Sequence, residues 1–337
     1  MENQFKYNKP LYLELGGSLK NLEISYHTYG KYNHKKNNVI WVCHALTANS
    51  DVADWWNGII GKNKLYDPDE YFIVCANCIG SCYGSTGPLS YNSKTNKHYY
   101  RSFPNITIRD MVNAHNILRL HLGIKHIHTI IGSSMGAFQA IEWNIINPNI
   151  FTNLVFIASS AKASAWAIVL NESQRMAILS DDTYYGDNEE GGVKGLMTAR
   201  SIALLSYRTS LSYNLTQREV DSGVTDGFKA ASYQQYQGLK LAKRFNAYSY
   251  YVLTKAIDSH NIERNRGQLN DVLKMIKART LCIGISTDLL FPTYEQKLIA
   301  DGINNAVYRE IDSDYGHDGF LIENEELTRI INEFYQS

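Results

Sequence analysis

The chain carries a serine in a setting typical of nucleophilic catalysis. Ser134 is the centre of Gly132-Ser-Ser-Met-Gly136, a G-x-S-x-G stretch that follows an apolar strand-like run and precedes a helical pattern. A turn this tight needs glycine at its flanks, and it presents the central side chain above the edge of a sheet. Ser133 is the nearby competitor, but the register of the glycines selects Ser134. We therefore expect Ser134 to be the nucleophile.

A serine hydroxyl needs a general base, and the base needs an acid that orients it. With this type of turn, the acid and then the histidine follow the serine along the chain. Asp288 comes directly after a strand-like run, and His317 is the only one of ten histidines beyond it. The sequence predicts a triad of Ser134, Asp288 and His317, with Asp312 and Asp314 as alternative acids.

Acyl transfer also needs hydrogen-bond donors for an oxyanion. One donor is normally the backbone N–H that follows the nucleophile, here that of Met135. The other comes from a loop after an early strand, which points to the N–H of Leu46. His44 lies in that loop, but His317 already occupies the place of the base, so we assign His44 a structural role.

Strand-like runs alternate with helical patterns over most of the chain, as in a mostly parallel sheet covered by helices. The runs are continuous and apolar, as strands buried on both faces require. They cover residues 39–43, 71–75, 127–131, 154–157 and 280–285. Together with the serine turn and the triad order, this pattern predicts the α/β-hydrolase fold, with a mostly parallel sheet flanked by helices.

The strand-like runs disappear from about residue 162 to residue 277, and helical spacing takes over. Helices are expected at 171–179, 193–207 and 233–256. We interpret residues 162–277 as a helical lid inserted into a core domain formed by residues 1–161 and 278–337.

Composition narrows the class of function. Lys+Arg and Asp+Glu both count 33 in 337 residues, so no basic surface predicts binding to nucleic acid or to an anionic membrane. There is no apolar run of membrane-spanning length and no signal peptide. The five cysteines are odd in number and partly in apolar runs, which favours reduced thiols in a cytoplasmic protein over a metal site.

Several blocks of the chain together resemble the homoserine O-acetyltransferase family, and the resemblance runs from about residue 24 to residue 334. Plain esterases share only the G-x-S-x-G stretch and the triad order. The blocks are Cys43-His-Ala-Leu-Thr47, Gly84-Ser-Thr-Gly-Pro88, Phe103-Pro-Asn-Ile-Thr-Ile-Arg-Asp-Met111, Gly132-Ser-Ser-Met-Gly136, Tyr236-Gln-Gly238, Arg244-Phe245, Asp288-Leu-Leu-Phe-Pro292 and Gly316-His-Asp318.

The resemblance implies transfer of an acetyl group from acetyl-CoA to the hydroxyl of L-homoserine, a step toward methionine, with no bound cofactor or metal. It also implies that Arg200, Tyr207 and Asp318 hold the amino acid, and it suggests a homodimer packed through lid helices. One departure is Asn246, which stands where aspartate is usual.

The residue types and their spacing are compatible with binding an amino acid in this way. Arg200 and Tyr207 are seven positions apart on an expected helix and share a face. A guanidinium among apolar neighbours suits a carboxylate, and Asp318 beside the catalytic histidine suits an ammonium group.

Three alternatives remain open: a succinyl-CoA-dependent or serine-acylating relative, a simple serine esterase, and a non-catalytic binding protein of the same fold, against which the intact triad argues. A succinyl group carries a second carboxylate that needs a cation. The stretch Gly80-Ser-Cys-Tyr-Gly84, expected beside the acyl pocket, has none, and this favours acetyl.

Overall fold

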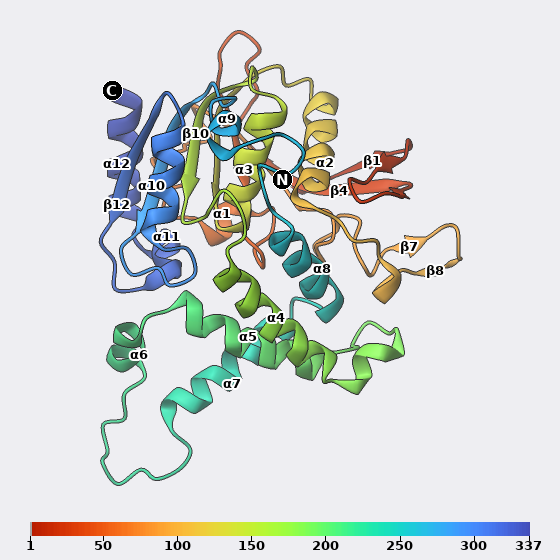
Figure 1. The fold of residues 1–337 in the computed structure, drawn as a ribbon, viewed down its shortest axis with the longest axis vertical. Coiled ribbons are helices and arrows are strands. Elements are labelled where there is room, and N and C mark those ends of the chain that lie inside the picture. Colours follow the sequence, from red (N-terminus) through yellow and green to blue (C-terminus); the bar gives the residue numbers. More distant parts are fainter. Residues whose placement is uncertain (1) are drawn as a thin grey trace.

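The computed structural model describes residues 2–337, and an eight-stranded sheet forms its centre (Figure 1). The strand order is β1-β4-β6-β5-β9-β10-β11-β12. The six strands β6, β5, β9, β10, β11 and β12 run parallel to one another. At the β6 side of the sheet, β4 pairs antiparallel with β6, and β1 pairs antiparallel with β4. The bounds are β1 Glu2–Tyr7, β4 Leu22–Tyr29, β5 Val39–Cys43, β6 Phe72–Ala76, β9 Ile127–Ser133, β10 Phe151–Ile157, β11 Arg279–Ile285 and β12 Ala306–Ile311. The predicted α/β-hydrolase architecture is confirmed.

Two layers of helices cover the sheet. One face packs against α2 Ile108–His121, α3 Met135–Ile146, α9 Leu269–Leu273 and α10 Thr293–Gly302. The other face packs against α1 Val52–Trp55, α11 Gly319–Ile322 and α12 Asn324–Gln336.

Strand β5 shows why the central strands are continuously apolar. All five of its residues are buried. Ile40 and Val42 join the core on one side of the sheet, whereas Val39, Trp41 and Cys43 join the core on the other. Side chains alternate along a strand, so a strand covered on both faces needs apolar residues at every position.

The antiparallel strands β1 and β4 were not predicted from the sequence. β1 alternates exposed and half-buried residues, because it lies at the edge of the sheet. Two small hairpins were also missed. Their strands are β2 Leu11–Tyr12, β3 Ser18–Leu19, β7 Tyr91–Asn92 and β8 Lys97–His98.

The helices between β10 and α9 gather at one end of the sheet, at the bottom of Figure 1. We call them the helical block: α4 Ala165–Leu179, α5 Val193–Tyr207, α6 Ser210–Thr216, α7 Lys229–Ala242 and α8 Ala247–Asp258. The chain enters and leaves this block at adjacent positions. Ala163 donates its N–H to the carbonyl of His260 (3.0 Å), and Ile262 donates to that of Ala161 (3.1 Å).

The single helix expected over 233–256 is wrong, because the chain breaks between α7 and α8. Asn246 begins α8 as its N-cap, with extended backbone, and its side chain accepts the N–H of Ser249 at 2.8 Å. Asparagine and aspartate are both strong N-cap residues, so asparagine replaces the more usual aspartate here without loss of the cap.

All five cysteines are free thiols, and all but Cys82 are buried. Within residues 2–337, no group of three or more His, Cys, Asp or Glu side chains has the arrangement of a metal site. No helix in the same range is long and apolar enough to cross a membrane.

Candidate active site

Ser134 lies at the sharp turn between β9 and α3. Its φ is 55° and its ψ is −126°, a region that non-glycine residues rarely occupy. A Cβ atom at position 132 would lie 2.3 Å from the carbonyl oxygen of Gly136, and a Cβ at 136 would lie 2.0 Å from that of Cys43. Both flanking positions therefore have space only for glycine, as the motif predicts.

Two hydrogen bonds hold the backbone of Ser134 in this conformation. Its N–H donates to the carbonyl of Ile157 (3.1 Å), and its own carbonyl accepts the hydroxyl of Ser159 (2.9 Å). Ser133 is fully buried beside it, whereas Ser134 borders a cavity. The turn therefore offers the hydroxyl of Ser134 and not that of Ser133.

His317 and Asp288 form a buried pair. Nδ1 of His317 lies 2.7 Å from Oδ2 of Asp288, and their side chains are 4% and 0% exposed. The other carboxylate oxygen of Asp288 accepts the backbone N–H groups of Leu290 (2.8 Å) and Phe291 (3.0 Å). An ionised carboxylate with these donors keeps the proton of His317 on Nδ1, which leaves Nε2 as the basic nitrogen.

The alternative acids lie elsewhere. Asp312 and Asp314 are exposed, and Asp312 accepts the hydroxyl of Ser286 at 2.9 Å. Neither makes the contact that Asp288 makes with His317. The geometry therefore favours Asp288 as the orienting acid.

The pKa of His317 is raised above its ordinary value of 6.5. Burial alone lowers it, but the charge and the hydrogen bond of Asp288, together with the charge of Asp318, outweigh the burial. The ring also packs among Tyr207, Phe291 and Phe320, with centroids 5.6, 5.5 and 5.4 Å away. These rings restrict the orientation of the imidazole.

The loop after β5 carries the predicted oxyanion donor Leu46. A turn closes this loop, since Ala48 donates its N–H to the carbonyl of Ala45 (3.1 Å). Within the described chain, the N–H of Leu46 has no acceptor. The N–H of Met135 opens α3 and, like others in a first turn, lacks an intrahelical acceptor. Both donors are available to an oxyanion.

His44 supports this loop and is not placed as a base. Its Nδ1 lies 2.9 Å from the carbonyl oxygen of Ala45, and its Nε2 accepts the N–H of Cys78 at 3.0 Å. Burial lowers the pKa of His44 to about 4, so the ring is neutral near pH 7. Both ring nitrogens are used by the backbone.

Helix α5 brings Arg200 and Tyr207 over the catalytic loop. The guanidinium carbon of Arg200 lies 5.5 Å from the centroid of the Tyr207 ring, on the same face of the helix. Among residues 2–337, no carboxylate pairs with Arg200. Gly316, with φ of 64°, accommodates the end of α5: a Cβ there would lie 3.0 Å from the carbonyl oxygen of Tyr207. An anion in the cavity therefore finds a free guanidinium.

Asp318 is paired in the structure, which the sequence did not indicate. Its Oδ2 lies 3.1 Å from Nε of Arg208, whose guanidinium packs over the ring of Tyr233 (5.4 Å). Arg208 follows the last residue of α5 in extended conformation, and this turns its side chain back toward the catalytic loop. An ammonium group at Asp318 would share the carboxylate with Arg208.

These residues surround one cavity of about 470 Å³ between the sheet and the helical block. Ser134, Leu46, Arg200, Tyr207, His317 and Asp318 all line it. Sequence reasoning missed further lining residues, which come from α1, α7 and the α7–α8 linker: Asp54, Trp55, Lys240 and Arg244.

Stretch 80–84 itself carries no cation and does not line the cavity, but Arg244, a cation from a distant part of the chain, both lines the cavity and contacts the stretch. Arg244 reaches across from the helical block and donates to the hydroxyl of Tyr83. The sequence argument considered only local residues, so it could not detect a cation more than 150 positions away. The composition of stretch 80–84 therefore does not distinguish an acetyl from a succinyl group.

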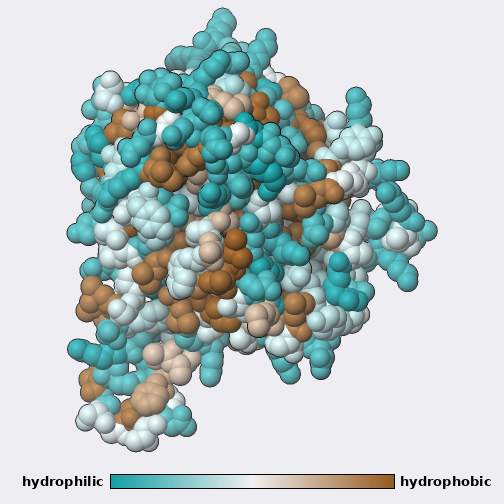
Figure 2. All heavy atoms as spheres, in the orientation of Figure 1, coloured by the Kyte–Doolittle hydropathy of each residue, from teal (hydrophilic) through white to brown (hydrophobic). Residues whose placement is uncertain are grey.

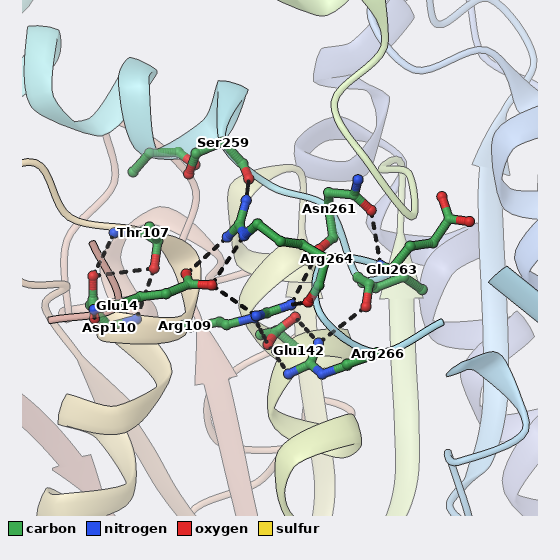
Figure 3. A network of polar contacts seen from close by, with 12 residues as sticks. Glu14, Thr107, Arg109, Asp110, Glu142, Ser259, Asn261, Glu263, Arg264 and Arg266 are labelled. Atoms are coloured by element: carbon green, nitrogen blue, oxygen red, sulfur yellow. Dashed lines mark hydrogen bonds and ion pairs between the residues drawn. The ribbon is translucent and has the colours of Figure 1, made fainter. Parts of the chain in front are cut away.

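An ionic network anchors the base of the helical block to the core (Figure 3). Arg109 of α2 bridges Glu14 (2.8 Å) and Glu142 of α3 (2.8 Å). Arg264, just after the block, pairs with Glu14 at 2.8 Å, and Arg266 pairs with Glu142 at 2.9 Å. Glu142 lies on the helix that begins at the nucleophile, so the network connects that helix to the block.

A family model described as alpha/beta hydrolase fold matches residues 38–323. The curated homoserine O-acetyltransferase of Cyclobacterium marinum is 49% identical over 331 residues, which cover 98% of this chain and 94% of that protein.

Solved structures of two kinds resemble this one. A homoserine O-acetyltransferase from Bacillus anthracis has a TM-score of 0.92 at 24% identity, covering 99% of this chain and 97% of that one. Esterase E22 has a TM-score of 0.90 at 24% identity, covering 99% of both chains. At these identities the likeness establishes the fold alone, and proteins named as transferases and as esterases share it.

Proposed function

The chain belongs to the homoserine O-acetyltransferase family of the alpha/beta hydrolase fold, and from this premise we propose that it transfers an acetyl group from acetyl-CoA to the hydroxyl of L-homoserine. The observation that carries the proposal is the cavity itself. It joins Ser134 and the His317–Asp288 pair on the sheet side to an unpaired Arg200 on the side of the helical block.

In the first half-reaction, Nε2 of His317 takes the hydroxyl proton of Ser134 while Oγ of Ser134 attacks the thioester carbon of acetyl-CoA. The oxyanion of the tetrahedral intermediate accepts the N–H groups of Leu46 and Met135. The intermediate collapses, the carbon–sulfur bond breaks, and His317 returns its proton to the departing thiolate of CoA. The product is an acetyl ester on Ser134.

In the second half-reaction, the hydroxyl of homoserine takes the place of the CoA thiol. His317 removes its proton as the oxygen attacks the acetyl ester, and then protonates Ser134 as O-acetylhomoserine departs. Arg200 holds the α-carboxylate of homoserine, and Asp318 receives its ammonium group. Burial raises the pKa of Tyr207, so its phenol stays protonated and can donate to the bound carboxylate.

The helical block acts as a lid in this scheme. Water would hydrolyse the acetyl ester, so a transferase must exclude it from the cavity until homoserine is bound. Helix α5 overlies the catalytic loop and places Arg200 and Tyr207 above His317. Neither the proposed chemistry nor the family requires a metal or a prosthetic group.

A simple esterase is the second candidate, because esterase E22 shares the fold. An ester substrate without an amino-acid moiety gives no purpose to the free guanidinium of Arg200 or to the nearby carboxylate of Asp318. The 49% identity to a named transferase also favours transfer.

The experiment is an assay of free-thiol release from acetyl-CoA and from succinyl-CoA, each with and without homoserine or serine. We expect fast release only with acetyl-CoA plus homoserine. Thiol release that no amino acid accelerates would indicate an esterase. A preference for succinyl-CoA or for serine would assign the chain to the corresponding relative.

We further propose that the protein forms a homodimer through the helical block. We also propose that it is cytoplasmic. Large apolar side chains are exposed on helices α4 to α7 and on the segment 217–228 that connects α6 to α7. They include Trp166, Met176, Leu205, Leu211, Leu215, Val220 and Tyr236. Figure 2 shows apolar surface over this lower part of the molecule. Contiguous exposed apolar surface is typical of a protein interface, and the free thiols fit a reducing compartment.

A further inference from the structure

Arg244 lies in the short linker between α7 and α8 and reaches the core. Its Nη1 donates to the carbonyl oxygen of Thr47 (2.5 Å) and to the hydroxyl of Tyr83. Thr47 belongs to the turn after β5, and Tyr83 lies in the loop after β6. One guanidinium nitrogen of the helical block therefore connects two loops of the sheet domain beside the cavity.

The Arg244 side chain is exposed, but the backbone that carries it is held in place. The backbone carbonyl of Arg244 accepts a hydrogen bond from the thiol of Cys82 (3.6 Å). Phe245 is buried and meets the ring of Tyr83 edge-on at 5.7 Å. Asn246 then caps α8. The residues on both sides of the guanidinium are thus anchored.

The loop that Arg244 contacts is the one that carries the proposed oxyanion donor. Leu46 and Thr47 are the central residues of the turn closed by the bond from Ala48 to Ala45. His44 holds the start of this loop through its ring nitrogens. Arg244 holds the end of the turn through the carbonyl of Thr47. The N–H of Leu46 therefore lies between one anchor from the sheet domain, His44, and one from the helical block, Arg244.

We propose that Arg244 is a positioning residue that aligns the oxyanion turn, so that acylation of Ser134 depends on the docked α7–α8 linker. This inference rests on the proposed acyl chemistry at Ser134. It assigns Arg244 a role in the first half-reaction, distinct from the amino-acid grip of Arg200. An oxyanion donor acts only if it meets the developing charge at hydrogen-bond distance, so a turn that is free to move loses part of its effect.

The test uses p-nitrophenyl acetate, which acetylates the serine but carries no phosphate. Removing one oxyanion donor costs about 10²- to 10³-fold, so Arg244→Ala, which misplaces a donor, should slow the burst of p-nitrophenol about 10- to 100-fold. Added guanidinium ion should restore part of the rate. The matched control is Lys243→Ala, an exposed neighbouring cation that does not border the cavity, and its burst rate should not change.

Tyr83→Phe provides a second route if Arg244→Ala folds poorly. It keeps the ring packing on Phe245 and deletes only the hydroxyl that Arg244 contacts, so we expect a smaller fall in the burst rate. A normal burst rate in both variants would overturn the inference.

The same variants assayed with acetyl-CoA distinguish positioning from phosphate binding. A rate lost with acetyl-CoA but intact with p-nitrophenyl acetate would mean that Arg244 binds the phosphates of CoA, and the inference would be wrong. If the wild-type protein does not use acetyl-CoA at all, the proposed function fails. The p-nitrophenyl acetate result still decides the role of Arg244 in that case.

Discussion

Asp288 accepts Nδ1–H of His317 across 2.7 Å, and no other carboxylate of the catalytic loops makes this contact. The pair comes from the loops that follow the adjacent parallel strands β11 and β12, so the sheet brings the acid and the base to the same edge. The two backbone N–H bonds to Asp288 fix the carboxylate from behind. The orientation of the imidazole is thus built into the fold before any substrate binds.

Asp288→Asn should lower turnover by about 10⁴-fold, as loss of the orienting acid does in serine proteases. The amide oxygen accepts the N–H groups of Leu290 and Phe291, which leaves the amide NH2 facing Nδ1 as a donor, so the imidazole adopts the wrong tautomer. Homoserine binding should change little, because Asp288 does not line the cavity. Steady-state kinetics measure both effects. An active Asp288→Asn with an inactive Asp312→Asn would move the acid to the other loop.

The pH dependence of acylation should identify the base. The pKa of His317 is raised above 6.5, and only its neutral form accepts the proton of Ser134. The rate of the p-nitrophenyl acetate burst should therefore fall as the pH drops through a value above 6.5. The buried His44 has a pKa of about 4. An acid limb near pH 4 would point to His44 and against His317.

Arg200→Ala should separate the two half-reactions. Acetyl-CoA has no carboxylate at the reacting carbon, so acetylation of Ser134 should stay close to normal. A hydrogen bond to a charged group contributes about 1.5–3 kcal/mol, so transfer to homoserine should fall about tenfold or more. Single-turnover kinetics of each step give the answer.

Lys194→Ala is the control for Arg200→Ala, because Lys194 is an exposed cation of the same helix outside the cavity. It should leave both steps unchanged. Equal losses in both steps of Arg200→Ala would mean a structural role for Arg200, or a role in binding CoA.

Glu142→Gln should destabilise the fold. The Glu142 side chain is 1% exposed and pairs with Arg109 and Arg266. Removing one partner of a buried ion pair costs up to about 3–5 kcal/mol; here it leaves the charge of Arg266 without a carboxylate, while Arg109 keeps Glu14. Denaturant unfolding measures the change. Glu326→Gln breaks an exposed pair with Arg329 and should have a much smaller effect. Similar midpoints for the two variants would show that the network does not stabilise the block.

The sequence predicted those parts of the site that depend on local pattern and chain order. The glycines around Ser134 select the nucleophile because no Cβ fits at their positions. Chain order then selects Asp288 and His317. Arg200 and Tyr207 were expected from the family resemblance, and the helical spacing that places residues seven apart on one face agrees with it.

Non-local contacts could not be predicted in this way. The bond from Arg244 to Thr47 spans 197 positions, and the pair of Arg208 with Asp318 spans 110. The break between α7 and α8 was missed because helical spacing continues across it, although Asn246 was its local signal. Strands β1 and β4 could not be predicted from continuous apolar runs, because β1 lies at the edge of the sheet and β4 carries polar residues between its apolar ones.

The most direct test of the account is the identity of the covalent intermediate. The protein is mixed with acetyl-CoA without homoserine, quenched within milliseconds, digested and analysed by mass spectrometry. We expect one acetyl group on the peptide that contains Ser134, its disappearance on addition of homoserine with formation of O-acetylhomoserine, and no label in Ser134→Ala. An acetyl group on Ser133 or on a cysteine, or no acetyl-enzyme at all, would contradict the account.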